Sequence, residues 1–167
     1  MPKLRTIISG GQTGVDQAAL RAARNCGLTI GGWCPPGREC EAGLIPPEFA
    51  LKETPNDRSP EAPDVPHSQR TEWNARDSDG TLVIGAASLC EARAGDFGTE
   101  WTIACAKRYK RPLLVCGVGD PEAKKKIEQW VGANSVSTLN VAGPSELTSP
   151  GIGERSYTLL KRVFAAL

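Results

Sequence analysis

The feature that most constrains the fold of this chain is a strand-to-helix unit that occurs twice. Residues 7–16 read I-I-S-G-G-Q-T-G-V-D, where a short apolar run breaks into glycines before an alanine-rich amphipathic segment. The apolar positions of that segment recur at helical spacing, and Gly27 follows as a helix-ending glycine. A second apolar run at 81–85 is followed by a glycine turn at 95–99 and another helical segment. Each unit predicts a strand, a tight turn and a helix.

The same alternation continues along the rest of the chain. Apolar runs predict strands at 28–33, 50–53, 112–116 and 135–142. Helical spacing predicts helices over 69–79 and 121–131 and a final amphipathic helix that ends near Leu167. Because parallel strands need crossover connections, which are normally right-handed helices, this alternation predicts a parallel sheet covered on both faces. We therefore predict an α/β fold, a Rossmann-like three-layer sandwich with a mainly parallel sheet.

Two segments interrupt this pattern. Residues 34–43 are rich in proline and glycine, which predicts a loop without regular structure. Residues 54–68 are polar and proline-rich with no periodicity, so we expect a surface loop or lid there. A length of 167 residues suffices for one full domain and is short for two of ordinary size. We predict a single Rossmann-like ligand-binding domain over residues 1–167.

Composition argues against several classes of partner. With 40% hydrophobic residues, 23% charged residues and a formal charge of +1, the chain has the make-up of a soluble globular protein. This balance offers no electrostatic case for nucleic acid or membrane partners. No apolar run approaches the roughly 20 residues that span a bilayer, and the start, M-P-K-L-R, carries no secretory apolar region. We therefore predict a cytoplasmic protein.

Cysteine and histidine usage argues against a metal centre. The six cysteines contain no C-x-x-C pair, whereas zinc sites usually have close ligand pairs. Cys26, Cys105 and Cys116 sit in apolar stretches, where a free thiol behaves as a small core residue. His67 is the one histidine, so a Ser-His-Asp triad or a multi-histidine metal site would rest wholly on it. We expect no metal site.

The first glycine turn is a candidate anion site. Gly10, Gly11 and Gly14 leave the backbone uncovered where a helix starts, and unpaired N–H groups and the helix dipole attract anions at such a point. A phosphate or an oxyanion such as molybdate would fit there. The alternative is structural: glycine supplies a positive φ in a tight turn, and Thr13 with Asp16 fits a capping box that satisfies the helix donors.

Neither common nucleotide fingerprint is complete in this turn. It lacks the full G-x-G-x-x-G pattern, and T-G-V stands at 13–15 where a P-loop needs G-K-[ST]. We therefore expect no NAD site and no P-loop ATP site. Both glycine turns follow a strand and precede a helix. Both are predicted on the carboxyl edge of the sheet, where ligands of open parallel sheets bind.

The polar segment 69–79 is a second candidate wall of this site. On a helix, Arg70, Trp73, Asn74 and Asp77 fall on one side, and Glu72, Arg76 and Asp79 fall on another. In that arrangement Arg70 is able to clamp an oxyanion bidentately. The alternative is a solvated helix face with Glu72–Arg76 ion pairing, which stabilises a helix by only about a few tenths of a kcal/mol.

Several motifs in order resemble those of a known family. They are I-S-G-G-Q-T-G-V-D, G-G-W-C-P-P-G-R-x-x-E-x-G, Q-R-T-E-W-N-x-R-D-S-D-G-T-L, G-T-x-x-T and L-N-V-A-G-P-x-E, and they cover nearly the whole chain. The chain resembles the family described as putative molybdenum carrier proteins. That family is similar to the lysine-decarboxylase-like, Lonely Guy-related Rossmannoid domains, with the order of its elements permuted. The resemblance implies a nucleotide-like or pterin-phosphate ligand and carriage of molybdenum cofactor or molybdate.

The resemblance also implies the residues that contact the ligand. They are Gly10, Gly11, Gln12, Thr13, Gly14, Asp16, Arg38, Arg70, Trp73, Asn74, Asp77, Gly98, Thr99, Thr102 and Asn140, and Glu41, Thr71, Gly143 and Pro144 match the same motifs. The Lonely Guy-type phosphoribohydrolases carry P-G-G-x-G-T-x-x-E, and Thr102 stands where their glutamate acts. This departure argues against hydrolysis of a nucleoside monophosphate.

Three hypotheses of function stay open. The first, which we favour, is a non-catalytic binding or carrier protein that holds a phosphorylated, nucleotide-like ligand across the two glycine turns. The second is a hydrolase of an N-glycosidic or phosphoester bond that uses Glu72, Asp77, Asp79 or Glu100 as general base. The third is a regulatory or scaffold domain that senses a nucleotide and forms a homo-oligomer through Trp130 or the C-terminal helix.

Overall fold

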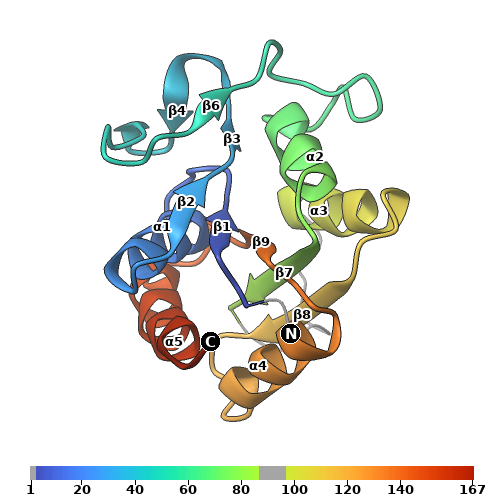
Figure 1. Ribbon diagram of the computed structural model, residues 1–167. Helices are drawn as coiled ribbons and strands as arrows, with labels where there is room; N and C mark the ends of the chain where they lie inside the picture. The colour runs from blue at the N-terminus through green and yellow to red at the C-terminus, as the bar shows by residue number, and fades with distance from the viewer. Residues whose placement is uncertain (1–2, 87–96) are drawn as a thin grey trace.

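Five parallel strands form the central sheet in residues 3–86 and 97–167, the part of the chain that the computed structural model describes (Figure 1). Their spatial order is β2-β1-β9-β7-β8. The strands are β1 (Thr6–Ile8), β2 (Thr29–Gly31), β7 (Gly80–Gly85), β8 (Leu113–Gly117) and β9 (Thr138–Ala142). The predicted α/β fold with a parallel sheet is confirmed.

The last strand in sequence, β9, is the middle strand of this sheet. It pairs with β1 on one side, where Ile7 lies opposite Leu139, and with β7 on the other, where Leu82 lies opposite Val141. Counted from β9, the strands lie in the spatial order 3-2-1-4-5, which matches the first five strands of a doubly wound sheet. The winding then reverses between β9 and β7. Ligands of such sheets bind at the carboxyl ends of the strands at this reversal.

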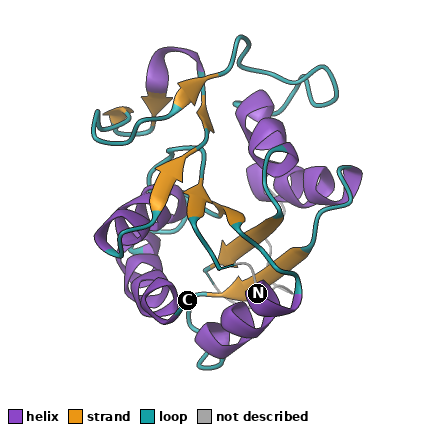
Figure 2. Cartoon of the chain, in the orientation of Figure 1, coloured by secondary structure: helices purple, strands orange, loops and turns teal. Residues whose placement is uncertain are grey.

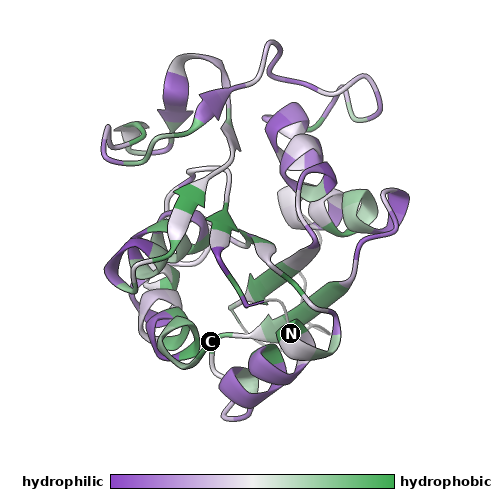
Figure 3. Cartoon of the chain, in the orientation of Figure 1, coloured by the Kyte–Doolittle hydropathy of each residue, from purple (hydrophilic) through white to green (hydrophobic). Residues whose placement is uncertain are grey.

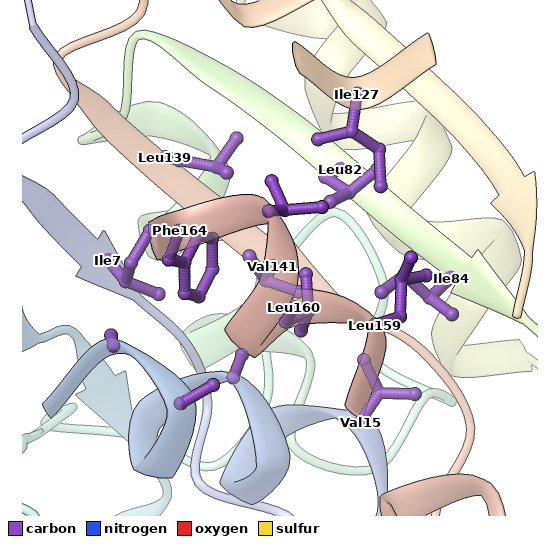
Figure 4. Packing of buried hydrophobic residues seen from close by; sticks show 14 of the residues in the cluster. Ile7, Val15, Leu82, Ile84, Ile127, Leu139, Val141, Leu159, Leu160 and Phe164 are labelled. Carbon is purple, nitrogen blue, oxygen red and sulfur yellow. The ribbon is translucent and has the colours of Figure 1, made fainter. Parts of the chain in front are cut away.

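Helices cover both faces of the sheet, so the three-layer prediction is also confirmed (Figures 1 and 2). One face carries α1 (Val15–Asn25), α4 (Ala123–Ala133) and α5 (Ile152–Ala166), and the other carries α2 (Ser68–Arg76) and α3 (Phe97–Arg108). The main core lies under the first group and includes Val15, Leu82, Ile84, Ile127, Leu139, Val141, Leu160 and Phe164 (Figure 4). Each fully buried Leu or Ile in this core stabilises the fold by roughly 2 kcal/mol.

The predicted strand at 28–33 is divided in two. β2 ends at Gly31, and β3 (Trp33–Cys34) pairs in parallel with β6 (Lys52–Glu53) outside the main sheet. Gly32 lies between them with a φ of +120°, and a Cβ there would lie 2.6 Å from the Ser9 carbonyl oxygen. The prediction of one strand is wrong because the chain takes a glycine-specific conformation against Ser9 and leaves the sheet.

The loop predicted at 34–43 contains short regular elements. A 3₁₀ turn, η1 (Pro36–Arg38), leads into an antiparallel hairpin of β4 (Glu39–Cys40) and β5 (Gly43–Leu44). The prediction of a loop without regular structure is therefore wrong here. The hairpin is held by contacts with distant segments of the chain, and these contacts could not be predicted from the composition of residues 34–43.

Residues 54–67 form no helix or strand, in agreement with the predicted loop. The segment is only partly superficial, because Thr54, Ser59 and Ala62 are buried. Figure 3 shows apolar residues concentrated on the central strands, whereas β4, β6 and much of this loop are hydrophilic. Over the residues that are described, no helix combines the length and apolar character that crossing a membrane requires.

Candidate functional site

A pocket of about 150 Å³ opens at the carboxyl edge of the sheet, near the reversal between β9 and β7. Its walls are the β1–α1 turn, the hairpin, one side of α2, the first turns of α3 and the segment after β9. One water molecule needs about 15 Å³ on the same measure. The pocket therefore has room for a small organic ligand.

The structure brings nine of the fifteen predicted ligand residues to this pocket: Gly10, Gln12, Asp16, Arg70, Asn74, Gly98, Thr99, Thr102 and Asn140. The six that do not line it are Gly11, Thr13, Gly14, Arg38, Trp73 and Asp77. Sequence reasoning missed Ala142, Ser145 and Thr148, and it gave Glu41, Thr71, Gly143 and Pro144 only as motif matches. The position of Ser145 and Thr148 in the sequence could have identified them, because they follow β9 at the same edge of the sheet where Gly10 follows β1.

Arg70 extends from α2 to the β1–α1 turn. Its Nη1 donates to the Gly10 carbonyl oxygen at 2.8 Å and lies 3.4 Å from Asp16 Oδ2. The side chain is 14% exposed, and its Nε is buried with no hydrogen-bond partner among the described residues. Gly10 leaves room for this arrangement, since a Cβ there would lie 2.3 Å from Nη1. A buried donor without an acceptor is uncommon in native proteins, so this guanidinium has hydrogen-bonding capacity that the described residues leave unused.

Asp16 lies in the first turn of α1, and its side chain is 7% exposed. Its Oδ2 accepts the Gln12 N–H at 3.2 Å. Burial raises the pKa of this carboxyl, and the Arg70 guanidinium opposes the rise. The pocket wall therefore holds a buried acceptor next to its buried cation.

Three N–H groups of the first glycine turn, those of Gln12, Thr13 and Val15, donate within the protein. Val15 N–H donates to the Pro144 carbonyl oxygen at 3.2 Å, and Thr13 N–H donates to Gln12 Oε1 at 2.9 Å. Gly14 is the N-cap of α1, and no side chain caps this helix. The predicted capping box is wrong, because the Thr13 hydroxyl donates to a carboxylate of the hairpin. The turn thus contacts other parts of the chain where the sequence predicted free donors.

Glu41 is that carboxylate, and it links the hairpin to two other segments of the pocket wall. Its backbone N–H donates to Gln12 Oε1 at 2.9 Å. Its Oε2 accepts the Thr13 hydroxyl at 2.8 Å and the Leu147 N–H at 3.2 Å. Burial alone would raise the pKa of Glu41, but hydrogen bonds from Ser145, Thr13 and Leu147 outweigh it and lower the pKa. The pocket wall therefore carries a second carboxylate, and the hydrogen bonds that it accepts favour its ionised form.

The predicted side of α2 faces this region, but several of its polar atoms hold β3. Asn74 Oδ1 accepts the Trp33 N–H at 2.8 Å, and Asn74 Nδ2 donates to the Trp33 carbonyl oxygen at 2.9 Å. Trp73 packs edge-on against Trp33 with ring centroids 4.8 Å apart. Asp77 Oδ2 accepts the Trp33 indole N–H at 2.8 Å. Trp73 and Asp77 therefore position β3 and do not line the pocket.

The predicted Glu72–Arg76 ion pair is absent from the ion pairs of the described residues, so that prediction is wrong. Glu72 accepts hydrogen bonds from the hydroxyls of Tyr109, at 2.9 Å, and Ser59. Arg76 pairs instead with the adjacent Asp77, with 2.7 Å between Nε and Oδ1. The segments that carry Ser59 and Tyr109 cover this side of the helix, which is why it is not a fully solvated face.

The Arg38 side chain supports the segment that follows the hairpin. Its Nη2 donates to the carbonyl oxygens of Phe49, at 2.8 Å, and Pro46, at 3.1 Å. Its Nη1 donates to the Leu51 carbonyl oxygen at 3.3 Å. These contacts direct the guanidinium to the protein backbone and away from the pocket.

The second glycine turn is described only in part. Gly95 and Asp96 lie outside the described residues, whereas Gly98 and Thr99 lie in the first turn of α3 and line the pocket. The Thr102 hydroxyl donates to the Gly98 carbonyl oxygen at 2.9 Å. The helix dipole is positive at this end of α3, which favours an anion nearby.

The described cysteines and His67 are not among the residues that line the pocket. Burial raises the pKa of the Cys105 thiol to about 12 and that of Cys116 to about 11. Within 3–86 and 97–167, no three His, Cys, Asp or Glu side chains are grouped to hold a metal ion; Cys90 lies outside these ranges. His67 Nδ1 lies 2.6 Å from Asp57 Oδ1.

Comparison with known proteins agrees with the strand order and with the motif resemblance. The chain is similar to a protein of solved crystal structure from Syntrophus aciditrophicus SB, named putative molybdenum carrier protein. The two are 36% identical with a TM-score of 0.83, over 98% of this chain and 96% of that chain. No curated protein matches. Residues 7–164 match the family described as circularly permutated YpsA SLOG, and this chain belongs to that family.

Proposed function

We propose that this protein binds and carries a phosphorylated nucleotide-like or pterin ligand, with molybdenum cofactor or molybdate as the candidate cargo. The observation that carries the proposal is Arg70, a largely buried guanidinium at the pocket wall whose Nε has no acceptor among the described residues. The name of the similar Syntrophus protein supports a molybdenum-related ligand.

The anionic group of such a ligand fits between Arg70 and the start of α3. Arginine presents a planar fork that suits phosphate and other oxyanions, and a helix start adds a positive dipole. The lining residues that are described include no cysteine or histidine. The fit therefore extends to the anionic group and not to direct ligation of a metal ion.

The carboxylates that the sequence nominated as general bases lie outside the pocket lining. These are Glu72, Asp77, Asp79 and Glu100. Asp79 Oδ2, for example, accepts the backbone N–H groups of Ser137 at 3.1 Å and Thr138 at 2.8 Å. This arrangement supports the hypothesis of a non-catalytic binding protein more than the hypothesis of a hydrolase that uses these residues.

A cytoplasmic location and a homo-oligomeric state stay predictions. The surface proposed for self-association includes Trp130, which packs partly buried against the core. Cell fractionation tests the location, and light scattering with and without GMP tests the assembly.

Isothermal titration calorimetry with GMP, AMP, inorganic phosphate and molybdate tests the proposed function. We expect at least one of these probes to bind the wild-type protein. Arg70→Met should weaken that binding by about tenfold or more, since a hydrogen bond to a charged group contributes roughly 1.5–3 kcal/mol. Arg70→Lys keeps the charge but loses the planar fork, so it should retain part of the affinity.

Arg24→Met is the matched control, because Arg24 is exposed in the last turn of α1. It should bind the same probes with wild-type affinity. The proposal is refuted if neither calorimetry nor a change in melting temperature detects any of these probes, or molybdopterin, at saturating concentration.

A further inference from the structure

The hairpin of β4 and β5 is a wall of the pocket without a buried residue. All of residues 39–44 are exposed or only partly buried, and Figure 1 shows β4 apart from the central sheet. By contrast, the pocket residues Asp16, Asn74 and Asn140 are no more than 5% exposed. Segments with few buried contacts open at a low cost in free energy, and the lids of binding sites are drawn from such segments.

The base of the hairpin is held more firmly than its tip. Ile45, which follows β5, is 2% exposed in the second core cluster, and its N–H donates to the Arg38 carbonyl oxygen at 2.9 Å. Within residues 39–44, Cys40 packs partly buried against that cluster. The tip, Glu41 to Gly43, is exposed. The pair formed by Arg38 and Ile45 is therefore a fixed base about which the tip is able to pivot.

Glu41 fastens the tip to two distant segments of the pocket wall. Its Oε2 accepts the Thr13 hydroxyl at 2.8 Å and the Leu147 N–H at 3.2 Å, from residues 28 and 106 positions away. Its backbone N–H donates to Gln12 Oε1 at 2.9 Å. Hydrogen bonds to an ionised group are stronger than those between neutral groups. The carboxylate of one exposed residue is therefore the main attachment of the tip.

We propose that the hairpin of β4 and β5 is a gate over the pocket and that the Glu41 carboxylate is its latch. When the bonds to Thr13, Leu147 and Gln12 break, the tip pivots on its base and opens a path for the ligand. This inference rests on the proposed function for its ligand and adds how a carrier retains and releases its cargo. The latch sets the rate at which the ligand exchanges.

Amide hydrogen exchange of the full chain tests the latch without a ligand. Glu41→Ala removes the carboxylate and keeps the backbone N–H that donates to Gln12. The protection factor of that N–H should fall by about fivefold or more, because the hairpin opens more often. The Ile45 N–H, at the base, should keep its wild-type protection. Equal losses at both positions indicate unfolding of the whole segment and contradict a gate, and no loss at position 41 contradicts the latch.

NMR line shapes during titration with GMP measure the association and dissociation rate constants of the ligand. AMP, inorganic phosphate or molybdate replaces GMP if GMP does not bind. Glu41→Ala should raise both rate constants by about fivefold or more, since the ligand enters and leaves through the same opening. Glu41→Gln keeps one acceptor oxygen, so it should give an intermediate increase, and it provides the readout if Glu41→Ala does not fold.

Glu39→Ala is the matched control, because Glu39 is exposed on the same hairpin and lies outside the pocket lining. It should keep both wild-type rate constants. A rise in the dissociation rate constant alone indicates that Glu41 contacts the ligand, and a rise in the association rate constant alone indicates that its carboxylate competes with the ligand. Either result, or unchanged rate constants, overturns the gate. Failure of every probe to bind overturns the proposed function, and hydrogen exchange then decides whether the latch holds the hairpin.

Discussion

Gly10, Asp16 and Arg70 hold one another in place at one wall of the pocket. The guanidinium donates to the Gly10 carbonyl and lies against the Asp16 carboxylate. Any side chain at position 10 would enter the volume that Arg70 occupies. Because Gly10 and Asp16 hold the guanidinium, the protein itself sets the orientation of this cation, which lowers the ordering cost of binding.

Also at the residue scale, we predict from the Arg76–Asp77 ion pair that the stability of the fold depends on pH. The Arg76 hydrogen bond is the main cause that lowers the pKa of Asp77, with a further contribution from the Trp33 indole N–H. The folded-state pKa lies below the ordinary value of 3.8. The stabilisation is therefore present above pH 3.8 and is lost as the pH falls through the folded-state pKa.

Asp77→Asn tests this dependence by urea unfolding. The Asp77 side chain is 40% exposed, so solvent screening limits the expected loss at about pH 7 to less than about 1 kcal/mol. As the pH falls through the folded-state pKa, the free energies of unfolding of wild type and variant should converge, because the wild-type carboxyl then becomes protonated. A difference that grows on acidification contradicts this assignment.

At the scale of elements, the start of α1 is joined to the segment that follows β9. Val15 N–H donates to the Pro144 carbonyl oxygen at 3.2 Å. Gly14, with φ 81° and ψ −126°, brings the backbone close to Pro144, since a Cβ there would lie 2.4 Å from that oxygen. Close approach of two chain segments therefore accounts for Gly14.

Gly14→Ala should consequently destabilise the fold more than Gly27→Ala. Both glycines have a positive φ, 81° and 75°, but a Cβ at Gly27 meets nothing within 4 Å. We expect a loss of about 1 kcal/mol for Gly27→Ala from backbone strain alone. Gly14→Ala should lose more than about 3 kcal/mol, because its conformation is rarer and the backbone contact adds to the strain. Urea unfolding measures both, and equal losses contradict the close-approach explanation.

Local sequence patterns were sufficient to predict the strands and helices that pack directly into the central sheet or against it. The strand at 81–85 and the helix after Gly14 could be predicted from the spacing of their apolar residues. Gly10 and Asn140 could be placed at the same edge of the sheet because the carboxyl ends of parallel strands meet there. Features set by distant contacts could not be predicted. β2 ends before Gly32 because the chain there lies close to the Ser9 backbone. Trp73 and Asp77 contact Trp33, and the position of Trp33 depends on this break in the strand.

At the scale of the whole molecule, the pocket brings segments from both ends of the chain together with segments from its middle. β1 pairs with β9, and the Ile7–Leu139 pair is separated by 132 positions, since 139 minus 7 is 132. Gly10 and Asp16 therefore line a complete pocket only after the segment 140–148 is in place. Pairing at such separation slows folding, because the entropy of closing a long loop opposes it.

A rearranged chain tests this consequence of the strand order. The new chain begins at Ser135, just after α4 in the exposed stretch 132–135. It joins Leu167 to Lys3 through a Gly/Ser linker of about twelve residues. β9, α5 and β1 then follow one another as a right-handed crossover unit, and the Ile7–Leu139 separation falls to about 45 positions.

We expect this rearranged chain to unfold cooperatively, to bind the same phosphate ester as the parent and to refold faster in stopped-flow measurements. Exposed connections tolerate new termini, whereas central strands do not. A control opened between Leu82 and Val83, both buried in β7, should therefore fail to fold. If the chain opened at Ser135 refolds more slowly than the parent, long-range β1–β9 pairing does not limit folding. If it folds without binding, the pocket depends on the connection between α4 and β9 as well as on the residues that line it.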